Sequence, residues 1–160
     1  MGRDLHEQSS ASRPPGELLP QWRKMSRPRT ATMIEVDCFP EDHLVKVRFR
    51  GNVTSREFAD LAAIIADFGS GVAVLVYLDW VGIERWEFTV ASANGVTTWR
   101  RASQVVGRAA IVHLPRLNRQ AAWLAAILRR EGVEVRSWRP KDAVAAAIWL
   151  RRPSTAAVLP

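Results

Sequence analysis

The side chains that could do chemistry in this chain of 160 residues are few and widely spaced. Its histidines, His6, His43 and His113, lie far apart, and the single cysteine, Cys38, leaves no partner for a disulfide or a multi-cysteine site. Zinc sites use His and Cys ligands at short, regular spacings, and this chain has no such pattern. We therefore predict no metal site and no cofactor.

One pair of residues could support general acid–base chemistry if the fold brought His113 beside Asp79. The histidine could take a proton, and the carboxylate could orient its ring. Ser92 and Ser103 lack the glycine-flanked setting of a nucleophilic serine, and no glycine-rich phosphate-binding or dinucleotide-binding pattern occurs. Since no sequence feature places His113 within reach of Asp79, we predict that the protein is not an enzyme.

Positive charge is concentrated in the second half of the chain. The formal net charge of +7 divides into +3 for residues 1–32, −5 for residues 33–99 and +9 for residues 100–152. Such a surface can attract nucleic acid, an anionic membrane or an acidic protein. The arginines also come in three pairs near predicted helix ends, where positive charge stabilises the helix dipole. These pairs are Arg100-Arg101, Arg129-Arg130 and Arg151-Arg152.

Two tails flank the part of the chain that can fold. Residues 1–32 are rich in Pro and Ser and poor in apolar side chains, so we predict a disordered tail, or an extension upstream of a true start at Met25 or Met33. Residues 153–160 are expected to form a C-terminal tail, which leaves residues 33–152 as a single domain. No apolar run is long enough for a membrane span or a secretory signal, so we expect a cytoplasmic protein.

The first half of the folded part begins with strand patterns. Met33–Val36 and Leu44–Arg50 are predicted to pair as an antiparallel hairpin, and apolar and basic residues alternate in the second strand. Thr54 and Glu57 match a capping box that begins an amphipathic helix. Residues 72–78 form a continuous apolar run, which is typical of a buried parallel strand.

The second half continues the alternation of strands and helices. A turn at 79–83 is expected to lead into a helix over 83–102, and strands over 108–113 and 133–138 flank a helix over 117–130. The last helix is expected to begin at Pro140 and to bury a stripe of Val144, Ala147, Ile148 and Leu150. Strands that alternate with helices require crossover connections and a mainly parallel sheet. We predict an α/β fold in the order ββαβαβαβα, with four or five strands and an antiparallel first strand.

Three stretches carry a family resemblance through their order and spacing. Val47–Thr54 forms a strand, a glycine turn and a Thr-capped helix start, Val74–Asp79 forms a strand closed by an acid, and Glu134–Trp138 precedes the helix pattern of Ala143–Leu150. In this arrangement the chain resembles the STAS-like superfamily, and within it the SpoIIAA-like branch. The resemblance covers residues 33–152.

This resemblance implies a mixed sheet with helices mainly on one side, and binding of a protein or small molecule instead of catalysis. The branch's similarity to Sec14-type lipid-binding domains further implies an apolar ligand. In anti-sigma factor antagonists of the superfamily, a serine after the central strand is phosphorylated and switches partner binding. Residues 79–83 contain no Ser or Thr, so we predict no phosphorylation site.

Ligands of open α/β sheets bind beside the carboxyl ends of the parallel strands. Loops at 51–54, 79–84 and 113–119 are expected there, next to helix N-termini that could hold an anion. Trp80 is expected in a turn, whereas most of the seven tryptophans are expected in the core. The alternative is that Asp79 and Asn118 only cap helices. The candidate binding residues are Asn52, Thr54, Asp79, Trp80, Trp86, His113 and Arg116.

The leading hypothesis is a non-catalytic binding domain, monomeric or homodimeric, for an unidentified protein partner or a small apolar or anionic ligand. The alternative is a binder of an anionic surface through the Arg-rich second half. Nucleic acid is the less favoured surface, because no helix-turn-helix or glycine-rich RNA motif occurs. The two hypotheses differ in salt dependence, since binding driven by arginines weakens steeply as salt rises.

Overall fold

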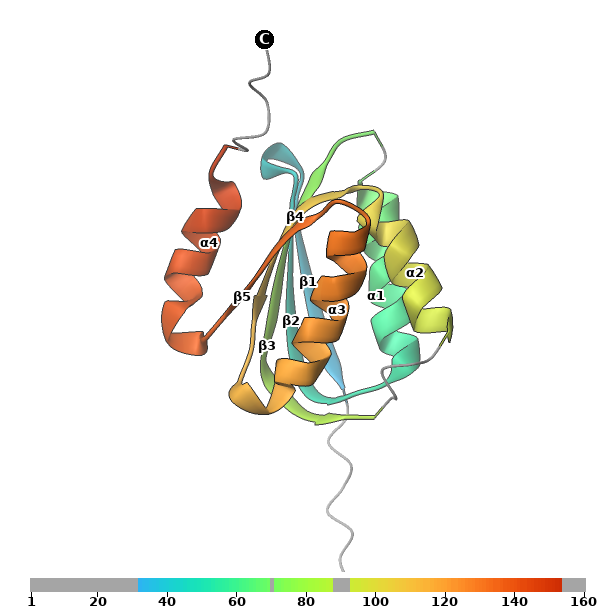
Figure 1. Ribbon diagram of the computed structural model, residues 1–160, viewed down its shortest axis with the longest axis vertical. Helices are drawn as coiled ribbons and strands as arrows, with labels where there is room; N and C mark the ends of the chain where they lie inside the picture. Colours follow the sequence, from blue (N-terminus) through green and yellow to red (C-terminus); the bar gives the residue numbers. More distant parts are fainter. Residues whose placement is uncertain (1–31, 70, 88–92, 154–160) are drawn as a thin grey trace, which may run out of the picture.

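The computed structural model describes residues 32–69, 71–87 and 93–153, and the strands among them form one five-stranded sheet (Figure 1). Adjacent strands follow one another in sequence, and β1 is antiparallel to β2 while every other neighbouring pair is parallel. This arrangement confirms the predicted α/β fold, its element order and its antiparallel first strand. The strands are β1 (Met33–Phe39), β2 (Leu44–Val53), β3 (Val74–Trp86), β4 (Val106–Val112) and β5 (Glu134–Trp138).

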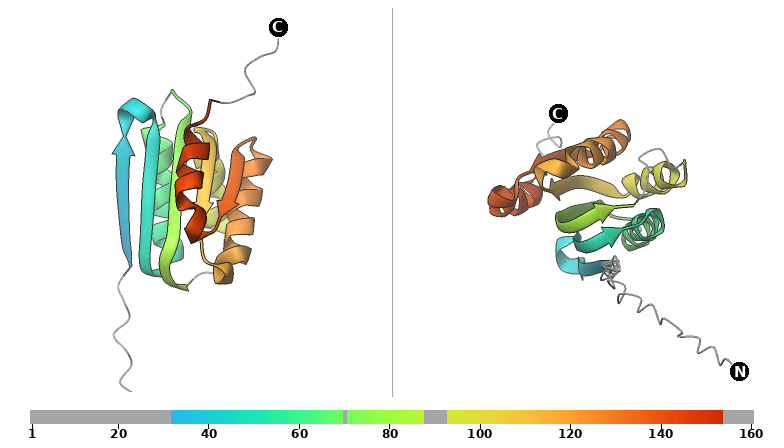
Figure 2. Two further views of the ribbon diagram at one scale, coloured as in Figure 1. Left: turned by 90° about the vertical axis from the view of Figure 1, so that its left-hand side faces the viewer. Right: turned by 90° about the horizontal axis from the view of Figure 1, so that it is seen from below.

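Helices cover both faces of the sheet, but unequally. The connecting helices α1 (Ser55–Phe68), α2 (Ala93–Ser103) and α3 (Asn118–Arg130) lie on one face, and α4 (Ala143–Arg151) lies on the other (Figures 1 and 2). Right-handed crossovers between strands that advance in one direction place all the connecting helices on the same side. The last helix makes no crossover, so it can pack on the opposite face.

Two hydrophobic clusters correspond to the two faces. The larger one lies under α1, α2 and α3 and includes the fully buried Phe49, Trp80 and Trp99. The smaller one lies between the sheet and α4 and includes Tyr77 and Trp149. The side chains of each strand therefore alternate between two cores of different size.

The start of α1 follows the predicted capping box. The Thr54 hydroxyl accepts a hydrogen bond from the Glu57 amide at 3.4 Å, and the Glu57 carboxylate accepts one from the Thr54 amide at 3.0 Å. Partial burial alone would raise the pKa of Glu57, but the hydrogen bonds from Thr54 and from the Thr32 side chain together outweigh it, so the pKa is lowered. The sequence pattern and the structure agree at this helix start.

The predicted turn at residues 79–83 and helix start at residue 83 are wrong. β3 continues through this segment to Trp86, and Arg50–Val53 extend β2 alongside it. Trp80 and Ile83 are fully buried on the helix side of the sheet, whereas Val81 packs on the other side. β3 continues as a strand because its large side chains, Trp80 and Ile83, are buried in the core on the helix side of the sheet. Burial of large side chains on one face favours a strand over a helix in this segment, which also contains Gly82.

The predicted buried stripe of α4 is also wrong in part. The side chains buried against the sheet are Ala146, Trp149 and Leu150, whereas Val144 is 74% exposed and Ile148 is 56% exposed. All five residues are apolar or aromatic, so hydrophobicity alone could not tell which side of this helix faces the sheet.

Most of the predicted tails, residues 1–32 and 153–160, lie outside the described residues. Within the part of the chain that is described, no helix combines the length and the apolar composition needed to cross a bilayer.

Candidate functional site

The carboxyl ends of the parallel strands are held together by the chain's own polar groups. The guanidinium of Arg116, which follows β4, donates to the carbonyl of Ile83 in β3. The buried His113 lies 3.0 Å through Nδ1 from the Leu114 carbonyl, and its amide donates to the Trp138 carbonyl at 3.1 Å. Hydrogen bonds within the chain therefore engage the side chains of Arg116 and His113, both of which were predicted to bind a ligand here.

The remaining candidate residues are divided between the two faces of the sheet. Trp80 and Trp86 belong to an aromatic group on the helix side, 4.9 Å apart and 6.0 and 5.2 Å from the Phe58 ring. Asn52 is a half-buried residue inside β2, and Thr54 caps α1. The fold thus separates Trp80 and Trp86 from Asp79, which lies on the other face.

Asp79 and His113 are not joined by any contact within the described residues. Asp79 accepts a hydrogen bond from the Val81 amide at 3.0 Å and lies 4.0 Å from Arg48. It caps no helix, and Leu117, not Asn118, is the N-cap residue of α3. The alternative that Asp79 and Asn118 only cap helices is therefore wrong, because Asp79 lies inside β3 and Asn118 is the first residue of α3.

Among the described residues, a broad part of the sheet carries no helix. α4 lies over β3, β4 and β5 and reaches the start of β2, where Leu44 is buried in the same cluster, whereas β1 and the rest of β2 are uncovered on that side (Figure 2). We call the uncovered part, with Glu35 on β1, Lys46 and Arg48 on β2 and Asp79 on β3, the open face. Arg48 links the three strands, because Nη1 lies 2.7 Å from Glu35 and Nε lies 4.0 Å from Asp79.

One cavity of about 600 Å³ lies on the open face near the carboxyl half of β2 and β3. Its lining includes Arg48, Arg50, Asp79 and Glu84, so cations and carboxylates are mixed within it. The β2–β3 register shifts twice beside it, between Arg48 and Arg50 and between Gly51 and Asn52. Such bulges bend a strand and redirect its side chains.

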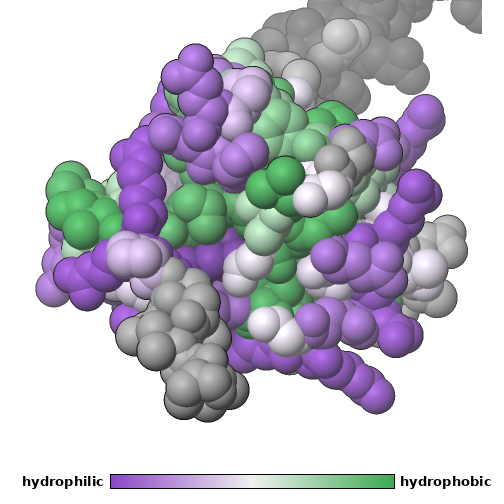
Figure 3. Space-filling model, turned by 90° about the horizontal axis from the view of Figure 1, so that it is seen from above, coloured by the Kyte–Doolittle hydropathy of each residue, from purple (hydrophilic) through white to green (hydrophobic). Residues whose placement is uncertain are grey.

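A second cavity of about 430 Å³ lies between α4 and the edge of the open face, and we call it the α4 groove. The sheet supplies Leu44, Lys46 and Tyr77 to its lining. The helix supplies Ala143, Val144, Ala147, Ile148, Leu150 and Arg151. Figure 3 shows hydrophobic residues at the left of the molecule, where α4 lies.

The charged side chains that line the α4 groove are both cationic. Lys46 Nζ lies 5.6 Å from the centre of the Tyr77 ring, and Arg151 lies 3.5 Å from Asp42 at the edge of the groove. Tyr77 is 8% exposed and its hydroxyl donates to the Ala143 carbonyl at 3.5 Å. Burial, and then the negative charge of Asp79, raise the pKa of Tyr77.

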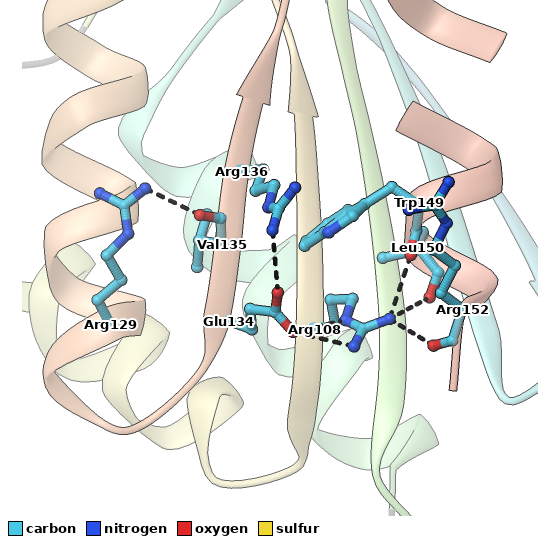
Figure 4. Close-up of polar contacts among 8 residues, drawn as sticks. All are labelled: Arg108, Arg129, Glu134, Val135, Arg136, Trp149, Leu150 and Arg152. Atoms are coloured by element: carbon cyan, nitrogen blue, oxygen red, sulfur yellow. Dashed lines mark hydrogen bonds and ion pairs between the residues drawn. The ribbon is translucent and has the colours of Figure 1, made fainter. Parts of the chain in front are cut away.

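Arg108 fixes α4 in place. This arginine of β4 is 6% exposed, and Nη1 donates to the carbonyls of Trp149 and Arg152 at the end of α4, at 3.1 and 2.5 Å (Figure 4). Its Nε and Nη2 each lie 2.9 Å from Glu134 in β5. The guanidinium therefore satisfies helix carbonyls that would otherwise lack partners, and it sets the position of the groove wall.

Comparison with known proteins bears on the fold. No family model and no curated protein matches the chain. A crystal structure of an uncharacterised protein from the DUF3478 family, with a SpoIIAA-like fold, from Shewanella loihica PV-4, superposes with a TM-score of 0.54. Its sequence is 13% identical, and the match covers 75% of this chain and 94% of that chain. The protein has a SpoIIAA-like fold.

Within this SpoIIAA-like fold, sequence reasoning missed the residues of the α4 groove. The alternation of β2 did indicate that Lys46 and Arg48 share a face, but no signal in the sequence showed that this face carries no helix in the described part of the chain. Val144 and Ile148 are spaced four residues apart, which fits a buried stripe and an exposed binding ridge equally well. Among the described residues, no three His, Cys, Asp or Glu side chains are grouped to hold a metal ion.

Proposed function

We propose that the protein is a binding domain without catalytic chemistry of its own, and that it binds through the α4 groove and the adjoining open face. The observation that carries the proposal is the exposure of Val144 and Ile148 beside a cavity whose floor contains Leu44 and Tyr77. Exposed apolar side chains that adjoin a concave surface are typical of interaction sites.

The chemistry of the groove supports binding over catalysis. Its polar side chains are Lys46, Tyr77 and Arg151. Activated nucleophiles need an adjacent base, and general acid–base pairs need groups with separate pKa values near neutrality. Lys46 and Arg151 instead supply fixed positive charge, and Tyr77 is held in its neutral form by burial.

We favour groove binding over the alternative of an anionic surface. The three arginine pairs do lie at one end of the molecule, because α2, α3 and α4 all end there (Figure 1). Acidic residues share that end, and Glu131 pairs with Arg100 at 2.9 Å while Asp42 pairs with Arg151 at 3.5 Å. Mixed charge of this kind gives a weak attraction for a polyanion.

We extend the proposal to a cytoplasmic location. Cys38 is a free, exposed thiol, and free exposed thiols are more compatible with a reducing compartment than with an oxidising one.

Chemical-shift mapping by NMR tests the proposed surface. Anilinonaphthalene sulfonate, which is both apolar and anionic, is titrated into the ¹⁵N-labelled full chain. We expect the largest shift changes around Leu44, Tyr77 and Ile148, and a weaker response in Ile148→Asp. Ile64→Asp is the matched control, because Ile64 is 46% exposed on α1, across the sheet. Changes concentrated at His113 and Arg116 would instead place the site at the carboxyl edge and contradict the proposal.

A further inference from the structure

The outer edge of β1 has the features of a strand that can pair with another strand. Among the described residues no strand pairs with this edge, and α1 lies behind β2 and does not extend past it (Figure 2). β1 is seven residues long, contains no proline or lysine and pairs with β2 without a register shift. Such features commonly interrupt edge strands, because an unpaired row of amides and carbonyls can bind a further strand.

The opposite edge of the sheet, at β5, is closed by a side chain. The Trp138 carbonyl accepts a hydrogen bond from the His113 amide, so alternation along β5 turns the Val135 carbonyl away from β4. Arg129 on α3 donates to this Val135 carbonyl at 2.8 Å. A strand that approached β5 would have to displace the guanidinium, whereas nothing in the described part of the chain occupies the edge of β1.

Exposed apolar side chains follow the edge of β1 on both faces of the sheet. Met33 is 54% exposed and Phe39 is 43% exposed, and they lie at the two ends of β1 on the same face. On the other face, Ile64 of α1 is 46% exposed and lines a cavity of about 210 Å³ together with Ile34 and Val36 of β1. Apolar surface on both sides of an unpaired edge favours a further strand there.

Antiparallel pairing of β1 with β1 of a second copy makes these side chains complementary. In the register that pairs all seven residues, Val36 lies on the two-fold axis, and Met33 of each copy lies opposite Phe39 of the other. The exposed apolar residues therefore meet at both ends of the pair. On the other face, the two Val36 side chains lie together, between the two cavities that Ile64 lines.

Charge does not oppose this pairing. The register places Glu35 opposite Asp37 of the other copy, but each acid already has a cation beside it on β2. Glu35 lies 2.7 Å from Arg48, and Asp37 is registered with Lys46. Two acids and two bases from each copy thus form a neutral strip. A shift of the register by two residues would place Glu35 opposite Glu35 or Asp37 opposite Asp37, which is destabilising.

We infer that the protein forms a two-fold symmetric homodimer in which β1 pairs antiparallel with β1 of a second copy, so that the two five-stranded sheets become one continuous sheet. Because Arg129 closes the edge of β5, the association ends at the dimer and does not continue as a fibre. The edge of β1 is separate from the α4 groove, so the inference does not rest on the proposed function.

Analytical ultracentrifugation of the full chain tests the dimer and its register. We expect a mass that rises with concentration to twice 17.9 kDa. Met33→Glu and Phe39→Lys should each weaken the dimer by about tenfold, because each places a charge against an apolar side chain. Combined in one chain, they should give a dimer at least about threefold tighter than either single variant, since the register brings the two new charges together. Circular dichroism verifies that each variant is folded.

A disulfide tests the position of the two-fold axis. Val36→Cys combined with Cys38→Ser leaves one thiol per chain, directly opposite its counterpart in the dimer. Opposed residues of an antiparallel pair have Cα atoms roughly 5.5 Å apart, within the range of roughly 4.4–6.8 Å that a disulfide spans. Diamide, which takes up the two protons and two electrons that the thiols lose, should give a covalent dimer on a non-reducing gel. Arg130→Cys with Cys38→Ser, an exposed thiol on α3, should crosslink at least about tenfold more slowly.

Ile148→Asp, on the exposed side of α4, is the control for the sedimentation experiment and should leave the dimer unchanged. Equal dissociation by Ile148→Asp would overturn the inference, as would additive losses when Met33→Glu and Phe39→Lys are combined. Assemblies larger than a dimer would show that β5 is not closed and would also contradict it. If residues 1–31 of the same chain, or a strand of another protein, pair with β1 instead, the full chain stays monomeric up to about 0.5 mM, and the inference is wrong.

Discussion

At the residue scale, Arg108 decides where the last helix lies. Buried charges are costly unless they are paired and fully hydrogen-bonded. Arg108 meets this condition with Glu134 and with the carbonyls of Trp149 and Arg152, and its guanidinium lies 5.1 Å from the centre of the Trp149 ring. A basic residue inside an apolar strand therefore has a structural role that its neighbours in sequence do not indicate.

Replacing this arginine should weaken the fold. Arg108→Met removes the cap of α4 and leaves its carbonyls without their donor, so we expect a loss of about 2 to 4 kcal/mol in the free energy of unfolding. Urea denaturation measures it. Arg136→Gln is the control, because Arg136 is 56% exposed although it lies over the same Trp149 ring. A loss within about 0.5 kcal/mol is expected there, and an equal loss in both variants would contradict the role of Arg108.

Tyr77 is the only tyrosine of the chain, so its ionisation can be followed by absorbance without labels. Burial and then Asp79 raise its pKa, while Lys46 lies over its ring. We expect a titration midpoint above the ordinary value of about 10, and Asp79→Asn should move the midpoint down without removing the whole shift, because burial is the larger cause.

The same shift predicts how stability responds to alkaline pH. The folded state binds the phenolic proton more tightly than the unfolded state does, so this contribution is complete below pH of about 10 and is lost as pH rises through the folded-state pKa. Asp60→Asn, an exposed acid on α1, should leave the Tyr77 midpoint unchanged. A midpoint at or below that of a free tyrosine would show that the phenol is not buried.

At the element scale, the continuation of β3 past Asp79 is the main departure from the expected structure. β2 and β3 remain paired to Val53 and Trp86 despite two register shifts. Gly82 allows this pairing, because a Cβ there would lie 2.5 Å from the Phe49 carbonyl oxygen and 3.0 Å from Cγ of Arg50. The close approach of the two strands needs a residue without a side chain.

A methyl group at this glycine should therefore be destabilising. For Gly82→Ala we expect a loss of about 1 to 3 kcal/mol, because the contacted atom belongs to rigid backbone of β2. Gly107→Ala is the comparison, since its Cβ would meet only the Ala73 side chain at 3.2 Å and should cost less than about 1 kcal/mol. Thermal unfolding of both variants measures the difference in stability. Equal melting temperatures would contradict the prediction, because they would show that β2 can shift to make room for the added methyl group.

At the scale of the whole molecule, the two faces of the sheet are built differently. Three helices and a large aromatic core stabilise one face, whereas α4 packs on the other over a smaller cluster with help from Arg108. Elements with fewer buried contacts open locally before the molecule unfolds. The groove thus lies beside the smaller of the two hydrophobic clusters.

Hydrogen exchange should separate α4 from the rest of the fold. Amides of α4 are expected to exchange faster than those of β3, and Arg108→Met should accelerate α4 by more than about tenfold while β3 changes less. Exchange followed by mass spectrometry measures both elements in one experiment. Equal protection of α4 and β3 would mean that the two faces unfold as one unit.

The sequence by itself determined the fold class, because periodicity and capping are local. The period of two in β2, the capping box of Thr54 and Glu57, and the apolar runs of β3 and β4 each depend on neighbours along the chain. Their alternation then required a parallel sheet with crossovers. These features led to the predicted order of elements and to the antiparallel first strand, which the structure confirms.

Only the tertiary structure decided which surfaces are exposed. The side of α4 that faces the sheet, the burial of Trp80 and, among the described residues, the uncovered face of β1 and most of β2 depend on contacts between distant segments. A sequence of apolar residues such as Val144 to Leu150 fits either orientation, and Arg108 in a distant strand fixes the one observed. Local patterns specify elements, whereas exposure is a property of how the elements pack.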